Sequence, residues 1–136
     1  MIGTTGITRP HFLIDTVAAV ARLNGDPAIT LLLDADVDVS VPIITPGELY
    51  GGAEKSARAA ENIQRIDIFA EGADILFCDR QTAREYARIA NGLRKKGRPI
   101  PQNDMWIAAL ALQHQLTLVT RDQHFSHIEG LLLKTW

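Results

Sequence analysis

The segment from Pro101 to Asp122, PQNDMWIAALALQHQLTLVTRD, constrains the fold most, because it joins an apolar helix to an apolar strand. The sequence predicts a helix that begins at Asp104 with Asn103 as its N-cap. The residues after Asp104 are apolar on every side of this helix, which is typical of a buried helix. The run Leu116 to Thr120 is then a short strand of a sheet covered on both faces. Helix and strand run in opposite directions, so we expect Asp104 and Asp122 at the same edge of the sheet.

The rest of the chain alternates short apolar runs with helical segments, which predicts an α/β fold with a parallel sheet between helices. Thr45 as cap, Pro46 at the first helical position and Glu48 as the third form a capping-box signature. The helix from Thr45 and the next one, through Phe69, are expected to form an exposed helical arm. The other predicted helices are Val17–Leu23, Ala28–Leu33 and Gln81–Lys96, and the other strands are Phe12–Ile14, a run within Val37–Ile44 that Pro42 begins or interrupts, Ile75–Cys78 and Ile128–Leu133.

Length and composition bound the class of protein. The chain has 136 residues, which suits one domain, and its formal net charge of −2 gives no general attraction for nucleic acid. Cys78 is the single cysteine, which excludes an internal disulfide and fits a reducing compartment. No apolar run is long enough to span a bilayer. Residues 1–11 resemble a short extension without the features of a secretory signal, so we expect a cytoplasmic protein.

Four acidic residues are expected at one edge of the predicted sheet. Asp15 and Asp122 each follow a strand, while Glu48 and Asp104 lie in the first turn of a helix. Ligands of open parallel sheets gather beyond the carboxyl ends of the strands, where these side chains converge. Each acid also has a purely structural interpretation, because Glu48 can complete a capping box and Asp104 favours a helix N-terminus. Several carboxylates at one edge repel one another, which favours a bound cation.

A site made of carboxylates suits a hard cation, Mg²⁺ or Mn²⁺. Such an ion activates water for attack on a phosphodiester, and a second ion can stabilise the leaving oxygen. Arg121, beside Asp122, is a candidate to hold a phosphate of the substrate. A cluster of basic residues before Asp104 could also do so, but these cations more simply complement a helix C-terminus; they are Arg94, Lys95, Lys96 and Arg98.

In its motifs the sequence resembles PIN-domain proteins, specifically the VapC type of ribonuclease toxin from bacterial toxin–antitoxin pairs. The matching pieces are FLIDT, ITPGELYGGAEKS, RPIPQNDMWIAALAL and LTLVTRDQHFSHIEGL with a terminal tryptophan, in family order. The resemblance implies a PIN-like domain over residues 12–136, with about five parallel strands and a helical arm that serves a homodimer. It also implies Mg²⁺-dependent endoribonuclease activity, with RNA as substrate and a cognate antitoxin as partner.

Carried over by position, the resemblance assigns catalysis and metal binding to Asp15, Glu48, Asp104 and Asp122. Thr120, together with Asn103 and Arg121, is expected to support these acids or to contact the substrate. One position departs from the family: Val17 stands where the first motif usually has asparagine or serine. Because valine cannot form hydrogen bonds, we expect lowered activity or altered metal affinity.

Two alternative functions remain open. The first is a catalytically weakened PIN-like module for binding or regulation, which Val17 supports. The second is another Mg²⁺ phosphotransfer domain, although a paired Asp-x-Asp on the first strand is lacking. His124 and His127 are expected to have surface or packing roles, because neither cysteine nor a third histidine accompanies them. Tyr86 and Trp106 are expected in the core.

Overall fold

The computed structural model describes residues 9–136, so residues 1–8 of the expected N-terminal extension lie outside the described part. A five-stranded sheet in the order β3-β2-β1-β4-β5 crosses the domain, and every adjacent pair of strands is parallel. This architecture confirms the α/β fold predicted from the sequence. The strands are β1 (His11–Ile14), β2 (Asp38–Pro42), β3 (Asp74–Leu76), β4 (Thr117–Val119) and β5 (Leu133–Lys134).

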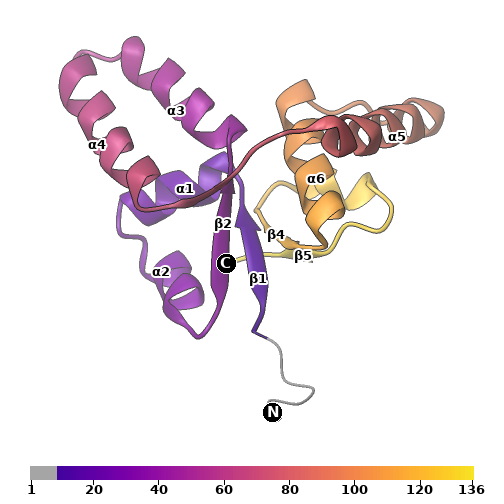
Figure 1. Cartoon of the computed structure of the whole chain (residues 1–136), viewed down its shortest axis with the longest axis horizontal. Coiled ribbons are helices and arrows are strands. Elements are labelled where there is room, and N and C mark those ends of the chain that lie inside the picture. The colour runs from indigo at the N-terminus through magenta and orange to yellow at the C-terminus, as the bar shows by residue number, and fades with distance from the viewer. Residues whose placement is uncertain (1–8) are drawn as a thin grey trace.

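Helices cover both faces of the sheet, and Figure 1 shows α1 to α4 on one side of β1 and β2 with α5 and α6 on the other. Alternate residues of β1 serve the two faces, since Leu13 packs in the cluster with α5 and α6 while Phe12 and Ile14 pack with α1 and α2. The helices are α1 (Thr16–Leu23), α2 (Pro27–Asp34), α3 (Ile44–Glu54), α4 (Ala59–Glu71), α5 (Arg80–Lys96) and α6 (Gln102–His114), and η1 (Gln123–His127) is a short 3₁₀ helix.

The apolar segment that dominates the sequence forms the centre of the domain. The middle of α6, from Ile107 to Ala111, is buried in the cluster that also contains Leu118 of β4. This confirms the prediction of a buried helix followed by a buried strand. The helix begins earlier than expected, however, at Gln102 and not at Asp104. Pro101 has an extended conformation (φ −55°, ψ 144°) and occupies the N-cap position, so the prediction of Asn103 as cap is wrong.

The start of α3 also differs from the prediction. The helix begins at Ile44, its N-cap residue is Ile43, and no side chain caps it. Thr45 is fully buried and its hydroxyl lies 3.3 Å from that of Thr16, so it does not form the expected capping box with Glu48. Because α3 begins at Ile44, Glu48 is the fifth residue of the helix and lies just beyond its first turn. Pro42 ends β2 where the sequence suggested a strand start or an irregularity.

Helices α3 and α4 pair as the predicted arm, and Figure 1 shows them side by side at one end of the molecule. The hydroxyl of Tyr50 in α3 donates a hydrogen bond to Asp67 in α4. Most residues of α4 are exposed or half-buried, and Ile66 is its buried residue. No helix among residues 9–136 is long and apolar enough to cross a membrane.

Candidate active site

Asp15 lies at the point where β1 ends and α1 begins. Its Oδ1 accepts a hydrogen bond of 2.9 Å from the main-chain N–H of Ala18, so it is the N-cap of α1. The residue is 5 % exposed, and this burial is the main reason that the pKa of its carboxyl is raised; nearby Asp122 and Glu48 raise the pKa further. Hydrogen bonds from Thr120 and from the N–H of Ala18 oppose this rise. The carboxylate is thus buried next to other acids.

The parallel register of β1 and β4 brings the next two site residues together. Ile14 pairs with Val119, and the N–H of Asp15 donates to the carbonyl oxygen of Val119 at 3.3 Å. Thr120 therefore lies beside Asp15 at the carboxyl ends of both strands. The Thr120 hydroxyl also accepts the main-chain N–H of Asp122 at 3.0 Å. One buried hydroxyl thus links two of the four acids.

Glu48 reaches the same edge from α3. The hydroxyl of Thr16, at the start of α1, donates a hydrogen bond to its Oε1. The side-chain amide of Asn103, in the first turn of α6, donates to its Oε2 at 3.3 Å. Three helices therefore meet at this carboxylate. The role of Glu48 in a capping box, which was the structural alternative, is excluded by these contacts.

Asp104 projects from the first turn of α6 toward the other acids. Burial is the largest cause of the raised pKa of its carboxyl; the charge of His124 counteracts it, while Glu48 and Asp122 add to the rise. Each of the two carboxylates with raised pKa values therefore feels the negative charges of Glu48 and Asp122. The structure brings the four predicted acids together at the edge formed by the carboxyl ends of β1 and β4.

His124 is a further candidate site residue, which the sequence pattern did not single out. Its Nε2 lies 3.0 Å from Oδ2 of Asp104, and its Nδ1 lies 3.2 Å from Oδ1 of Asp122. One oxygen or nitrogen from each of the three residues lies within 4.8 Å of the others. The prediction of a surface or packing role for His124 did not include these contacts with two of the four acids. The signal in the sequence was its position two residues after Asp122, and in the structure it lies in η1 directly after that acid.

The basic residues Arg121 and Lys96 donate hydrogen bonds to main-chain oxygens of other segments. The guanidinium of Arg121 donates from Nε and Nη2 to the main-chain oxygen of Trp136, at 2.9 and 2.7 Å, and lies 4.4 Å above the indole ring. Arg121 thus packs the end of the chain against the domain in this structure. Lys96 Nζ donates to the carbonyl oxygen of His127 at 2.9 Å. Lys96 lies with Arg94 and Lys95 in the last turn of α5. This position fits the alternative in which these cations complement the C-terminus of the helix.

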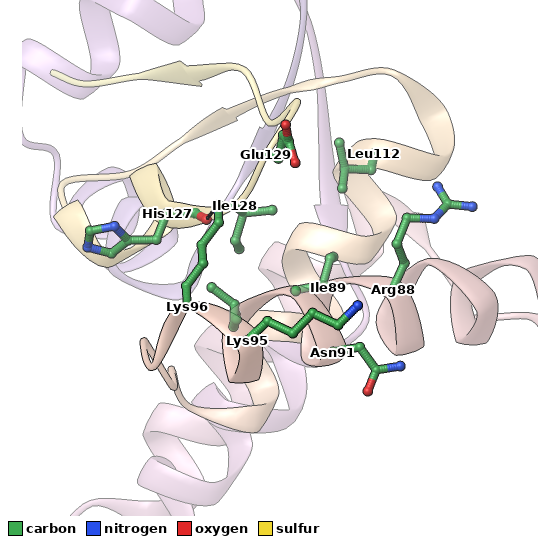
Figure 2. A pocket seen from close by; sticks show the side chains of 11 residues that line it. Arg88, Ile89, Asn91, Lys95, Lys96, Leu112, His127, Ile128 and Glu129 are labelled. Atoms are coloured by element: carbon green, nitrogen blue, oxygen red, sulfur yellow. Dashed lines mark hydrogen bonds between the residues drawn. The ribbon is translucent and has the colours of Figure 1, made fainter.

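A separate hollow of about 470 Å³ lies between α5 and residues 127–129. Figure 2 shows Arg88, Asn91 and Lys95 along α5, with Ile128 and Glu129 opposite them. None of the four acids lines this hollow. The acids converge instead at the carboxyl ends of β1 and β4, which makes this carboxylate edge the candidate active site.

The donor set at this edge fits a divalent cation. Carboxylate oxygens and one imidazole nitrogen are ligands that Mg²⁺ and the first-row transition metals accept in proteins. A bound cation would offset both the burial that chiefly raises the pKa values of Asp15 and Asp104 and the smaller contribution from repulsion by neighbouring acids. Within residues 9–136 no arginine forms an ion pair with the four acids, and the ion pairs of Asp104 and Asp122 are with His124.

Comparison with known proteins yields one consistent group. The sequence model of the PIN domain matches residues 12–131. The chain is 32 % identical to a ribonuclease VapC1 of Haemophilus influenzae over 92 % of this chain and 97 % of that protein. It is 33 % identical to the tRNA(fMet)-specific endonuclease VapC of Shigella flexneri, again over 92 % and 97 % of the two chains.

Solved structures give the same result for the fold. VapBC2 of Rickettsia felis, bound to a DNA fragment from its promoter, contains a chain that matches with a TM-score of 0.85 and 27 % identity, over 93 % of this chain and 98 % of that chain. VapBC-1 of nontypeable Haemophilus influenzae matches with a TM-score of 0.83 and 29 % identity over the same shares. The helical arm and the four acids lie within residues 12–131, which the PIN-domain model matches.

Proposed function

Because the chain belongs to the PIN-domain family, and within it to the VapC ribonucleases, we propose that its carboxylate edge cleaves RNA with the help of Mg²⁺ or Mn²⁺. The protein is an endoribonuclease of the kind found in toxin–antitoxin pairs. The observation that carries the assignment of the site is the convergence of Asp15, Glu48, Asp104 and Asp122 at one edge, two of them with raised pKa values. The choice of ion and the roles of these residues are parts of the proposal.

Asp15, Glu48, Asp104 and Asp122 hold the cation in this proposal. When bound, the ion supplies the positive charge that activates water and stabilises the oxygen leaving phosphorus. Thr16 and Asn103 fix the two oxygens of Glu48, while Thr120 orients Asp15 and the main chain at Asp122. The protein's contribution is thus to hold several mutually repelling carboxylates in fixed positions, ready for the ion and the phosphodiester.

Two protein partners are expected for this chain, a cognate antitoxin and a second copy of the chain itself. The similar structures are complexes named VapBC, so we expect a cognate antitoxin protein to bind this chain and to inhibit it. We also expect the α3–α4 arm to serve a homodimer, and the protein to act in the cytoplasm. Gel filtration and light scattering of the purified chain, with and without the antitoxin, test these two assemblies.

An RNA digestion tests the catalytic assignment. Wild-type protein is incubated with RNA and Mg²⁺, Mn²⁺ or EDTA, beside Asp104→Asn and the control Glu129→Gln, whose side chain lines the hollow of Figure 2. We expect cleavage with either metal, none with EDTA, and a loss of about a hundredfold or more in Asp104→Asn only. Cleavage that survives both chelation and Asp104→Asn would contradict the proposal.

A catalytically weakened module for binding or regulation is the second candidate. It is favoured by Val17, whose exposed side chain (57 %) cannot form hydrogen bonds at the start of α1. This candidate predicts metal binding without turnover. Absence of cleavage with Mn²⁺, in a protein whose thermal midpoint Mn²⁺ nevertheless raises, would select it over the active enzyme.

A further inference from the structure

The imidazole of His124 lies between two carboxylates. Nε2 faces Asp104 at 3.0 Å and Nδ1 faces Asp122 at 3.2 Å. A neutral imidazole carries one N–H, so one of its two nitrogens presents a lone pair to a negatively charged oxygen. Such a contact is repulsive unless a positive charge lies between the two atoms. That charge is a proton, on the ring or on the carboxyl, or a metal ion.

The two nitrogens of His124 differ in their surroundings. Nε2 is buried and forms no hydrogen bond of good geometry with any residue in the range 9–136, although Asp104 is within ion-pair distance. Nδ1 faces the more exposed carboxylate of Asp122. Histidines that bind metals usually donate the other ring N–H to a carboxylate, which fixes the ring. The environment of His124 fits this arrangement, with Nε2 as the metal ligand and Asp122 as the acceptor.

The distances fit a shared ion as well. In an octahedral shell with bonds of about 2.1 Å, neighbouring ligand atoms lie about 3 Å apart and opposite ones about 4.2 Å apart. The distance from Nε2 of His124 to Oδ2 of Asp104 is 3.0 Å, which corresponds to neighbouring positions. One possible ligand atom from each of Asp104, Asp122 and His124 lies within 4.8 Å of the other two, which is close to the separation of opposite ligands.

We propose that His124 binds the catalytic metal ion directly through Nε2, beside Asp104, and thereby makes the site favour Mn²⁺ over Mg²⁺. This inference rests on the proposed function, because it concerns the same ion. An all-carboxylate site is suited to Mg²⁺, whereas an imidazole nitrogen is a better ligand for a transition metal than for Mg²⁺. His124 thus becomes a determinant of metal selectivity.

Pulsed EPR of the Mn²⁺-loaded protein tests the bond itself. We expect the wild type, with one equivalent of Mn²⁺, to show electron spin echo modulation from a directly coordinated nitrogen. The modulation disappears in His124→Gln and persists in the matched control His127→Gln, three residues further along. Lys96 donates to the carbonyl oxygen of His127, so this control leaves that hydrogen bond in place. A wild-type spectrum without coordinated nitrogen overturns the inference and identifies His124 as an ion-pair partner only.

Calorimetry tests the selectivity. In His124→Gln we expect the affinity for Mn²⁺ to fall about tenfold or more, while that for Mg²⁺ changes less than about threefold. His127→Gln retains both affinities. Equal losses for Mn²⁺ and Mg²⁺, or no loss for either, overturn the inference. The thermal midpoint of each metal-free variant checks folding, and the wild-type spectrum decides the question alone if His124→Gln does not fold.

Asp104→Asn separates the failure of this inference from the failure of the proposed function. If this variant loses metal binding and RNA cleavage while the wild type shows no nitrogen coupling, the nuclease assignment stands and only the role of His124 falls. If Asp104→Asn retains the Mn²⁺ affinity of the wild type, the metal site itself is wrong and the inference falls with it.

Discussion

The side-chain amide of Asn103 donates a hydrogen bond to Oε2 of Glu48 at 3.3 Å, and thus joins the first turn of α6 to α3. The other oxygen of Glu48 accepts the hydroxyl of Thr16. Both oxygens of one acid are therefore held by donors from two different helices. This arrangement is a fixed carboxylate of the kind that a metal site needs, because a freely rotating side chain would have to be ordered when the ion binds.

Asn103→Ala should weaken metal binding about tenfold, because it frees Oε2 of Glu48 from its donor. Calorimetric titration with Mn²⁺ measures the change. Gln102→Ala is the matched control, since the Gln102 amide donates to the hydroxyl of Tyr86 and not to an acid of the site. Equal affinities in Asn103→Ala and the wild type would show that the hydrogen bond does not position Glu48 for metal.

Thr120→Val should lower both stability and RNA cleavage, whereas Thr120→Ser should retain both. The buried hydroxyl bonds Asp15 and accepts the N–H of Asp122, so valine leaves these groups without their partner. We expect a loss of about 1–3 kcal/mol in the free energy of unfolding and at least about tenfold slower cleavage. Urea unfolding and an RNA digestion measure the two effects. Identical behaviour of the valine and serine variants would show that the hydroxyl is dispensable.

Asp104→Asn should stabilise the metal-free protein at neutral pH. Burial, with Glu48 and Asp122 adding to it, raises the pKa of Asp104, so the folded state binds its proton more tightly than the unfolded state does. The stabilising contribution of this carboxyl is complete below its unfolded pKa and is lost as the pH rises through the raised folded pKa. The variant should therefore melt above the wild type at pH 7, and the difference should shrink on acidification.

Thermal melts in EDTA from pH 7 to pH 4 measure this dependence. A wild type that melts above Asp104→Asn at pH 7, or a difference that does not change with pH, would contradict the prediction. In the wild type, the affinity for Mn²⁺ should fall over the same range, because protons compete with the ion for Asp15 and Asp104, whose pKa values are both raised.

Val17→Asn should increase metal affinity or cleavage severalfold. Val17 is 57 % exposed in the first turn of α1, next to Thr16, whose hydroxyl bonds Glu48. An asparagine there adds a donor and an acceptor at the edge of the site, where hydrogen bonds to metal ligands strengthen binding. Parallel measurements of RNA cleavage at several Mg²⁺ and Mn²⁺ concentrations test the prediction. Equal rates with equal metal dependence would show that the position is idle in this protein.

Tyr86 and Trp106 should contribute to stability and not to catalysis. Their rings stack with centroids 4.1 Å apart and planes inclined by 18°, which joins α5 to α6. A double-mutant cycle with Tyr86→Leu and Trp106→Leu should give a coupling free energy of about 0.5–1.5 kcal/mol. RNA cleavage by the folded variants should remain close to that of the wild type. Cleavage lost at full stability would instead indicate that the rings stack on RNA bases.

The sequence determined the features that depend on local pattern. The continuous apolar run Ile107–Ala111 and the strand after it can be stable only in the interior, and alternation of strands with helices requires a parallel sheet. Acids directly after strands, such as Asp15 and Asp122, must then lie at its carboxyl edge, wherever the helices pack. For this reason the fold and the shared edge of Asp15 and Asp122 could be predicted without coordinates.

Tertiary structure decided which partner each polar side chain meets. Asn103 and Thr45 had suitable chemistry for helix caps. Instead, Asn103 bonds Glu48 and Thr45 bonds Thr16, and each partner is distant in sequence. His124 lies between Asp104 and Asp122 because η1 folds back over the start of α6. Such contacts depend on strand register and on where separate helices meet. A single hydrogen bond contributes only about 1 kcal/mol, so local preferences yield to the packing of the whole domain.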